Sequence, residues 1–262
     1  MQCLLDSALD PVVEEALKGK TGAAAEEALL ELKVCDPAVG SGHFLVGAAH
    51  RLARHLSMVR AQTQGESEPS PLLYQQALRD VIGRCLYGVD LNPMAAELCR
   101  VGLWLEALEP GKPLSFLDHH IRVGNSLLGA TPELLAGGLP DEAFSALEGD
   151  DKKACTALRK RNKAELTEMG DLFAQEDAEG RARLEAAAAA LDLMPDDRPE
   201  AVRAKELAFR RHEETPEYRQ KKQLADAWCA AFVVPKRFPP LASDPRFPSP
   251  DPEGITSAHL AN

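Results

Sequence analysis

The sequence reads Asp36-Pro37-Ala38-Val39-Gly40-Ser41-Gly42-His43-Phe44-Leu45 where a short apolar run gives way to a helical pattern. Glycines at two of these positions permit a tight turn and leave no side chain between the backbone and a ligand. Such a turn, between a strand and a helix, is where nucleotide-like ligands meet an open parallel sheet. A bare Gly-x-Gly is equally typical of an ordinary strand-to-helix turn. The dinucleotide fingerprint would require glycine or alanine where Leu45 stands.

Apolar periodicity predicts strands alternating with helices on both sides of this turn. Asp10-Pro11 is expected to open a helix, with Asp10 as the cap and Pro11 at the first helical position. Alternation of this kind predicts an α/β fold with a parallel sheet covered on both faces. We expect strands at 32–35, 85–89 and 121–123, and helices at 10–19, 23–30, 44–56, 71–82 and from 93 onward.

The amino-acid composition and the predicted secondary structure change after Gly138. Residues 141–218 are dense in Ala, Glu, Lys and Arg, which predicts two to four helices. The last segment is rich in proline and shows no periodicity, so it is predicted to be a loop or tail. We therefore expect three parts: a sheet-containing part at 1–138, a helical insertion at 139–234 and a Pro-rich tail at 235–262.

Composition narrows the class of protein. No run is apolar for long enough to span a bilayer, and no export signal is visible, so we expect a cytoplasmic protein with no membrane partner. The six cysteines form no CxxC pair and are interpreted as small buried apolar residues, with neither a metal site nor disulfides. The net charge is −11, so the sequence has no excess of basic residues for binding the phosphates of nucleic acid.

Three stretches, in order, resemble N6-adenine-specific DNA methyltransferases of the type IIG-like restriction-modification and phage-defence kind. Residues 36–44 are similar to that family's D-P-A-C-G-S-G-x-F signature, with Val39 in place of cysteine. Residues 87–95 are similar to its second motif and residues 116–129 to its third. The resemblance implies a Rossmann-like S-adenosylmethionine-dependent methyltransferase fold, here an incomplete parallel sheet with a helical insertion.

The resemblance also implies the residues that would bind S-adenosyl-L-methionine. Asp36 would face the ammonium and sulfonium region, Asp90 would accept hydrogen bonds from ribose hydroxyls, and Leu91 would pack on the adenine. Asn125 has the amide needed to read the adenine edge. Asp90 is otherwise typical of a helix-capping acid and Asn125 of a turn. The predicted cofactor-binding residues are Asp36, Pro37, Ala38, Gly40, Gly42, Phe44, Asp90, Leu91 and Asn125.

One motif of the family is missing from residues 1–262. The Asn/Asp-Pro-Pro-Tyr/Phe tetrad that contacts the flipped adenine does not occur, because Asn92-Pro93 continues into Met94 and Phe238 precedes the only Pro-Pro pair. No catalytic residue is therefore assigned. We expect the chain to be a fragment that is inactive alone, with one edge of its first strand unpaired. DNA would be contacted through sequence elsewhere, and the partner would be the rest of the methyltransferase or a restriction subunit.

Other interpretations stay open at this stage. The acceptor could be RNA, a protein or a small molecule, because cofactor motifs do not specify it. The chain could also be a non-catalytic remnant. His119 and His120 are adjacent, so in an extended segment their rings would point to opposite faces and could not share a metal. His43 is interpreted as a residue that starts a helix, and the basic run at 152–163 as a solvated helix face.

Overall fold

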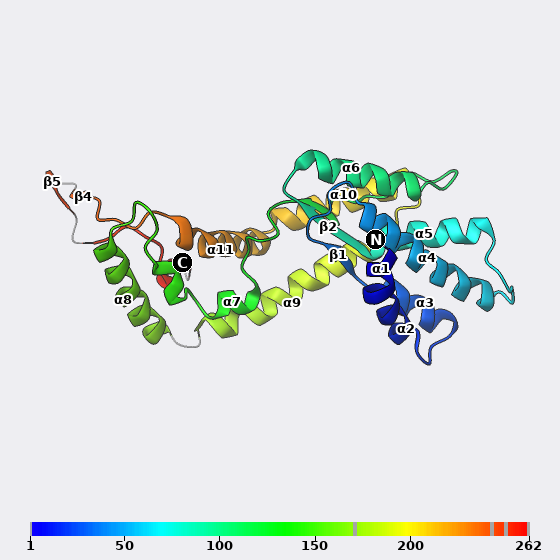
Figure 1. The fold of residues 1–262 in the computed structure, drawn as a ribbon, viewed down its shortest axis with the longest axis horizontal. Helices are drawn as coiled ribbons and strands as arrows, with labels where there is room; N and C mark the ends of the chain where they lie inside the picture. The colour runs from blue at the N-terminus through cyan, green and yellow to red at the C-terminus, as the bar shows by residue number, and fades with distance from the viewer. Residues whose placement is uncertain (1, 170–171, 242–243, 249–250, 261–262) are drawn as a thin grey trace. The chain divides into compact units, whose positions relative to one another are not determined.

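The computed structural model describes residues 2–169, 172–241, 244–248 and 251–260, and has an α/β architecture (Figure 1). The chain divides into two compact units. The first contains residues up to Ser126 together with Ala188–Arg211. The second contains Leu127–Ala187 and the residues from His212 onward. The predicted helical insertion, residues 139–234, is thus divided between the two units.

The first unit is built on the predicted parallel sheet. Its strands are β1 (Val34–Asp36), β2 (Leu86–Asp90) and β3 (Ile121–Val123), in the order β1-β2-β3. Asp36 pairs with Gly88, and Asp90 pairs with Val123. Among the described residues β1 has a strand on one side only, so the expectation of an unpaired edge holds for this part of the chain.

Two helices of the first unit begin at residues whose side chains cap them. Ser70 accepts a hydrogen bond from the Leu73 amide and Asn92 from the Met94 amide, at 3.2 and 3.0 Å, and each is followed by proline. Before β3, the helical elements of this unit are α1 (Gln2–Leu4), the π-helical turn η1 (Leu5–Leu9), α2 (Asp10–Leu17), α3 (Gly22–Leu30), α4 (His43–Thr63), α5 (Pro71–Arg84) and α6 (Pro93–Glu106).

Asp10 is the first residue of α2, but the prediction that its side chain caps the helix is wrong. The backbone is already helical from Gln2, and the residue before α2 is Leu9 in the right-handed helical region. The Asp10 side chain does not cap the helix, because its carboxylate binds the guanidinium of Arg51 on α4. An ion pair with a residue 41 positions later competes with local capping, and it cannot be read from the sequence around Asp10.

The two faces of the sheet are covered by segments far apart in the sequence. Alternate residues of a strand face opposite sides. A Cβ atom added at Gly88 would lie 2.8 Å from a methyl of Val39 and 3.2 Å from Leu45, so α4 covers that side. Tyr87 points the other way and donates a hydrogen bond of 2.7 Å to Asp192 on α9 (Leu172–Leu193). Residues of the helical insertion therefore complete the second face.

The core of the first unit is aliphatic. Its largest fully buried side chains come from α3, α4, α5, α6, β2 and the segment before β3, and they include Leu29, Leu45, Leu52, Leu56, Leu78, Ile82, Leu86, Leu103 and Leu117. Burial of such side chains contributes about 1.5–3 kcal/mol each before the opposing loss of conformational entropy. The sheet is small, so the helices supply most of this core.

The second unit has a smaller core of its own. Phe144, Leu158 and Ala231 are buried there, and the Trp228 indole donates to the Gly138 carbonyl at 3.0 Å. The helical elements that contribute residues to this unit are α7 (Pro132–Ala136), the 3-10 helix η2 (Asp141–Phe144), α8 (Lys152–Met169), α9, α10 (Pro199–Glu214), α11 (Pro216–Val233) and α12 (Ser257–Leu260).

The prediction of an irregular tail after residue 235 is wrong for its described residues. Two short strands, β4 (Pro240–Leu241) and β5 (Asp244–Pro248), pair antiparallel, and α12 follows. The buried Asn162 side chain donates to the Leu139 carbonyl and accepts from the Ser257 amide, both at 2.8 Å. Long-range hydrogen bonds therefore order a segment whose composition alone suggested none.

The structure also tests the predictions made for the cysteines and for membrane-spanning segments. Cys3 and Cys35 are exposed and Cys229 is only partly buried, so the interpretation of all six cysteines as buried holds for Cys85, Cys99 and Cys155 alone. Burial raises the pKa of Cys85 to about 12 and that of Cys99 to about 11. In the described part of the chain, no helix has the length and apolar character needed to cross a membrane.

A buried arginine gives a test of how the insertion is held. Arg79 on α5 is 4% exposed and donates to the Asp196 carbonyl at 2.9 Å and to its carboxylate at 3.3 Å. We expect Arg79→Ala to lower the free energy of unfolding by about 2–4 kcal/mol, because it removes a buried side chain together with its two hydrogen bonds to the partly buried Asp196. The exposed pair Glu206–Arg210 supplies the control, and Arg210→Ala should change stability by less than about 1 kcal/mol. Equal effects in urea unfolding would contradict this account.

Candidate functional site

The loop between β1 and α4 forms a tight turn that depends on two glycines. Gly40 and Gly42 have φ of +55° and +85°, a region that other L-residues rarely adopt. The Val39 amide donates to the Val89 carbonyl at 2.9 Å, which ties the turn to the end of β2. A Cβ added at Gly42 would lie 2.7 Å from the sulfur of Cys99, so α6 packs directly against the turn. His43 then begins α4, as predicted.

The carboxylate of Asp90 joins the turn to the end of the neighbouring strand. One oxygen accepts a hydrogen bond from the Gly40 amide at 2.8 Å, and the other accepts one from the Asn92 amide at 2.8 Å. These two backbone hydrogen bonds lower the pKa of Asp90. The two places that the sequence singled out, 50 residues apart, are thus in direct contact at the carboxyl end of the sheet.

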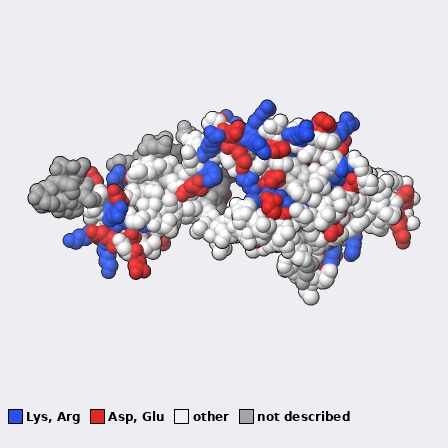
Figure 2. All heavy atoms as spheres, turned by 90° about the horizontal axis from the view of Figure 1, so that it is seen from above, with Lys and Arg blue, Asp and Glu red and all other residues white. Residues whose placement is uncertain are grey.

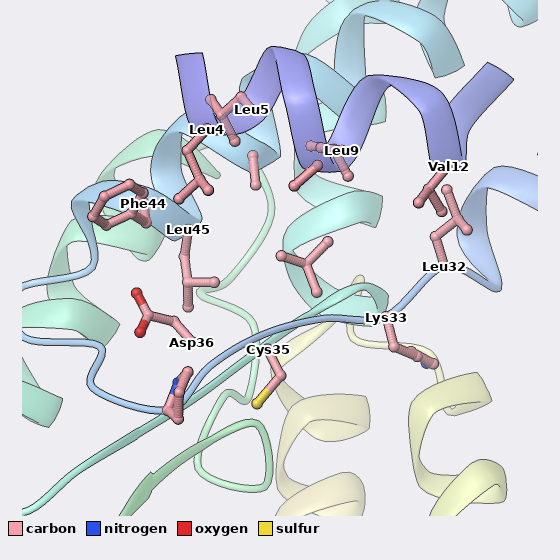
Figure 3. A pocket seen from close by; sticks show the side chains of 14 residues that line it. Leu4, Leu5, Leu9, Val12, Leu32, Lys33, Cys35, Asp36, Phe44 and Leu45 are labelled. Carbon is pink, nitrogen blue, oxygen red and sulfur yellow. The ribbon is translucent and has the colours of Figure 1, made fainter. Parts of the chain in front are cut away.

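Asp36 and Phe44 line a pocket on the other side of this turn. The pocket has a volume of about 470 Å³ and runs along the unpaired edge of β1 beneath α1 and α2. Its walls are largely apolar, with Asp36 and Phe44 toward one end and Lys33 toward the other (Figure 3). One oxygen of Asp36 accepts a hydrogen bond from the Ala38 amide at 3.0 Å.

The remaining predicted residues lie at the same edge of the sheet but outside this pocket. Leu91 is 70% exposed. Asn125 is also exposed and follows β3 two residues after Val123, the register partner of Asp90. The structure therefore brings Gly40 and Asp90 together and places Asp36, Pro37 and Phe44 around one pocket. Its lining does not include Ala38, Gly40, Gly42, Asp90, Leu91 or Asn125.

Sequence reasoning missed two residues that shape the turn. Gly88 gives Val39 room to pack across β2, and Cys99 fills the space beside Gly42. A glycine inside a strand pattern is a signal of close backbone or side-chain approach, so Gly88 could have been found. Nothing local marks Cys99, because its role depends on how α6 packs.

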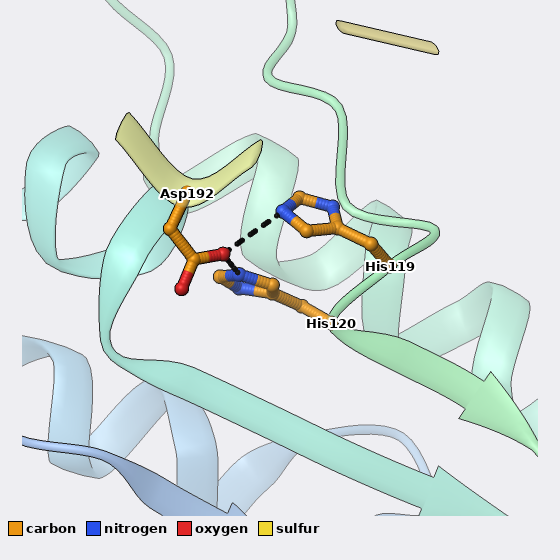
Figure 4. A group of neighbouring side chains, drawn as sticks. All are labelled: His119, His120 and Asp192. Atoms are coloured by element: carbon orange, nitrogen blue, oxygen red, sulfur yellow. Dashed lines mark hydrogen bonds and ion pairs between the residues drawn. The ribbon is translucent and has the colours of Figure 1, made fainter. Parts of the chain in front are cut away.

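The expectation that His119 and His120 point to opposite faces is wrong. Residues 118–120 form a turn ahead of β3 and are not extended. The two imidazole centroids lie 4.0 Å apart, and both rings approach the carboxylate of Asp192 (Figure 4). Burial lowers the pKa of His119, and it lowers that of His120 to about 4, so both rings are neutral near pH 7.

Over somewhat less than half of its length, the chain is similar in sequence to three proteins named as methyltransferases. The chain is 32% identical over 142 residues to a Methanocaldococcus jannaschii protein assigned as a type II restriction enzyme and methyltransferase. It is 33% identical over 126 residues to the adenine-specific methyltransferase PglX of Streptomyces coelicolor. It is 31% identical over 130 residues to the Escherichia coli type II restriction enzyme and methyltransferase RM.Eco57I. The matches cover 49%, 44% and 44% of this chain.

The chain is related to restriction and adenine-specific methyltransferases. The family resemblance carried by the three motifs is confirmed. The matched regions span 12%, 10% and 13% of these three relatives, so the chain corresponds to a small share of their length. No family model matches the chain, and no solved structure gives a significant match.

Adding one methyl group at Gly42 tests whether the stability of the turn depends on its close contact with Cys99. Gly42→Ala must strain the backbone at φ +85° and press against Cys99, and we expect it to destabilise the protein by about 2–4 kcal/mol. Gly65→Ala is the matched control, because Gly65 has φ +79° with nothing within 4 Å. The control should lose only about 1–2 kcal/mol of stability, because it introduces backbone strain without a steric contact. Thermal unfolding measures both variants, and equal losses would show that the contact with Cys99 is unimportant.

Proposed function

We propose that this chain is the S-adenosylmethionine-binding portion of a DNA adenine N6 methyltransferase from a restriction-modification or phage-defence system. The observation that carries the proposal is the hydrogen bond of 2.8 Å between the Gly40 amide and the Asp90 carboxylate. It joins a glycine turn and an acid at the carboxyl ends of adjacent parallel strands. That edge is where open α/β sheets bind nucleotide-like ligands.

The donors and acceptors at this edge suit an adenosyl ligand. A carboxylate offers about four lone-pair sites, and the backbone hydrogen bonds from Gly40 and Asn92 to Asp90 leave capacity for the two ribose hydroxyls. The exposed Leu91 follows directly and is suited to pack against an adenine ring, whose edge the amide of Asn125 would read. Ala38, Gly40 and Gly42 present small side chains or none toward a ligand.

Asp36, Pro37 and Phe44 would hold the other end of the same cofactor. Asp36 lies at the end of β1, where its negative charge would favour the ammonium and sulfonium groups. Phe44 is 43% exposed at the first turn of α4 and would cover the ligand from that side. S-adenosylmethionine, when bound, supplies an electrophilic methyl group. The protein residues orient it toward the acceptor and exclude water.

The assignment of DNA adenine as the acceptor rests on the relatives. Two of them are named as restriction enzymes and methyltransferases, and PglX is named as adenine-specific. Residues 1–262 contain no Asn/Asp-Pro-Pro-Tyr/Phe tetrad, so we propose that the groups contacting the adenine amino nitrogen come from sequence outside this chain. The chain would then bind cofactor and depend on that sequence for transfer.

The surface charge supports the proposal that the main DNA-binding surface lies in sequence outside this chain. The net charge is −11, and on the face drawn in Figure 2 the described basic side chains are interspersed with acidic ones. The predicted solvated face of α8 illustrates this, since Lys163 lies 2.8 Å from Asp141 and Arg161 lies 2.8 Å from Glu165. Proteins that bind DNA unaided rely on basic patches that neutralise phosphates.

Cofactor binding is tested by titration calorimetry with S-adenosylmethionine. Asp90→Ala removes the ribose acceptor and the partner of the Gly40 amide, so we expect Kd to rise about 10- to 100-fold, the equivalent of one or two hydrogen bonds to a charged group. Asp226→Asn on α11 is the control, because its carboxylate is 65% exposed and pairs with Lys222 on the same helix. Its Kd should match the wild type. Failure of the folded wild-type chain to bind would favour a non-catalytic remnant.

Methyl transfer is tested separately with radiolabelled S-adenosylmethionine and adenine-containing plasmid DNA. We expect this chain alone to transfer no label above a protein-free blank, because it lacks the tetrad that would accept hydrogen bonds from the adenine amino group. Adding the remainder of a matching methyltransferase should produce label in N6-methyladenine. Transfer by the isolated chain would refute the placement of the catalytic residues, and label in RNA or protein would identify another acceptor.

A further inference from the structure

Three side chains with metal-binding atoms meet at the amino-terminal end of the sheet, at the opposite end of the strands from the glycine turn. His119 and His120 come from the turn before β3, and Asp192 comes from the last turn of α9 (Figure 4). One ligand atom from each residue lies within 4.8 Å of the others. All three belong to the first compact unit, and the proposed cofactor site does not use them.

The spacing of these atoms fits a tetrahedral ion. His119 Nε2 and His120 Nε2 lie 3.4 and 3.0 Å from the same oxygen of Asp192, Oδ1. Zinc binds imidazole nitrogen and carboxylate oxygen at about 2.0–2.2 Å, so two ligands of a tetrahedral ion are about 3.4 Å apart. Both imidazoles face the same carboxylate oxygen, so the three potential ligand atoms form one close group.

His119 is left unsatisfied without an ion. Its side chain is 7% exposed, and neither ring nitrogen has a hydrogen-bond partner among the described residues. Buried polar atoms in native proteins nearly always have a partner, and leaving one unpaired costs about 1–3 kcal/mol. Nε2 lies 3.4 Å from the Asp192 carboxylate, an ion-pair distance, but this contact does not have the geometry of a hydrogen bond. A metal ion would satisfy this nitrogen.

The carboxylate of Asp192 is held in the orientation that a ligand requires. Its second oxygen, Oδ2, accepts hydrogen bonds from Tyr87 at 2.7 Å and from Lys33 at 3.0 Å. This leaves Oδ1 directed at the imidazoles. Outer hydrogen bonds of this kind are typical of metal ligands, because they fix both orientation and ionisation.

We propose that His119, His120 and Asp192 bind one zinc ion, with water as the fourth ligand, and that this ion fastens the helical insertion to the sheet. Two imidazoles and a carboxylate form a ligand set that zinc accepts readily. The ion would link α9 to the start of β3, elements 72 residues apart in sequence. Its role is structural, and the proposal does not depend on the methyl donor or its acceptor.

The proposal is tested on the chelator-treated full chain with Zn²⁺ and with Co²⁺ as a spectroscopic substitute. We expect one equivalent of Co²⁺ to bind and to give the visible absorption of tetrahedral nitrogen and oxygen ligation. Saturating Zn²⁺ should raise Tm by about 5–10 °C, since binding to the native state stabilises it. A wild-type chain that binds no Co²⁺ in equilibrium dialysis would overturn the proposal, as would strong sulfur-to-metal charge-transfer bands, which would assign the ion to cysteines.

Variants locate the ion. His119→Gln and Asp192→Asn keep similar shapes but remove ligands, and each should weaken Co²⁺ binding at least 10-fold and abolish the Tm shift. His50→Gln is the matched control, because His50 is half-buried with its Nδ1 2.7 Å from the Tyr74 hydroxyl, outside the cluster. It should leave Co²⁺ binding unchanged. Unaltered binding in both ligand variants would refute the site, and if one variant does not fold, the other and the wild-type stoichiometry still decide it.

Discussion

The hydrogen bond from the Gly40 amide to the Asp90 carboxylate is the constraint on which the candidate site depends. It exists only because β1 and β2 are parallel neighbours in a register that pairs Asp36 with Gly88. Both strands therefore end at the same edge, and the turn after one meets the acid after the other. The backbone of the turn must adopt positive φ to present its amide, which restricts these positions to glycine.

The second organising feature is the closure of the sheet by residues that arrive late in the chain. Tyr87, Lys33, His119 and His120 all approach Asp192, from β2, the residue before β1 and the turn before β3. A three-stranded parallel sheet exposes an apolar face unless something covers it, and here residues 188–211 belong to the same unit as the strands. Polar contacts determine the position of residues 188–211 on the sheet, because each buried hydrogen-bonding group needs a specific partner.

Much of the local structure could be predicted because it depends on neighbours in sequence. Ser70 and Asn92 cap α5 and α6 with their own side chains, and the strands match apolar runs that end at Asp36 and Asp90. Predictions failed where a distant partner intervened. Asp10 binds Arg51 and does not cap a helix, and the C-terminal segment is ordered by Asn162. The adjacent histidines turn to one side because their segment is not extended.

The sequence by itself determined the parallel α/β arrangement, the glycine turn, the acid at the end of the second strand and the family resemblance. These follow from periodicity, capping and motif order, which are local properties of the chain. Only the tertiary structure decided that Gly88 and Cys99 shape the turn, that residues 188–211 close the sheet and that two histidines meet one carboxylate. Those outcomes depend on side chains brought together across long loops, and no short-range pattern encodes such contacts.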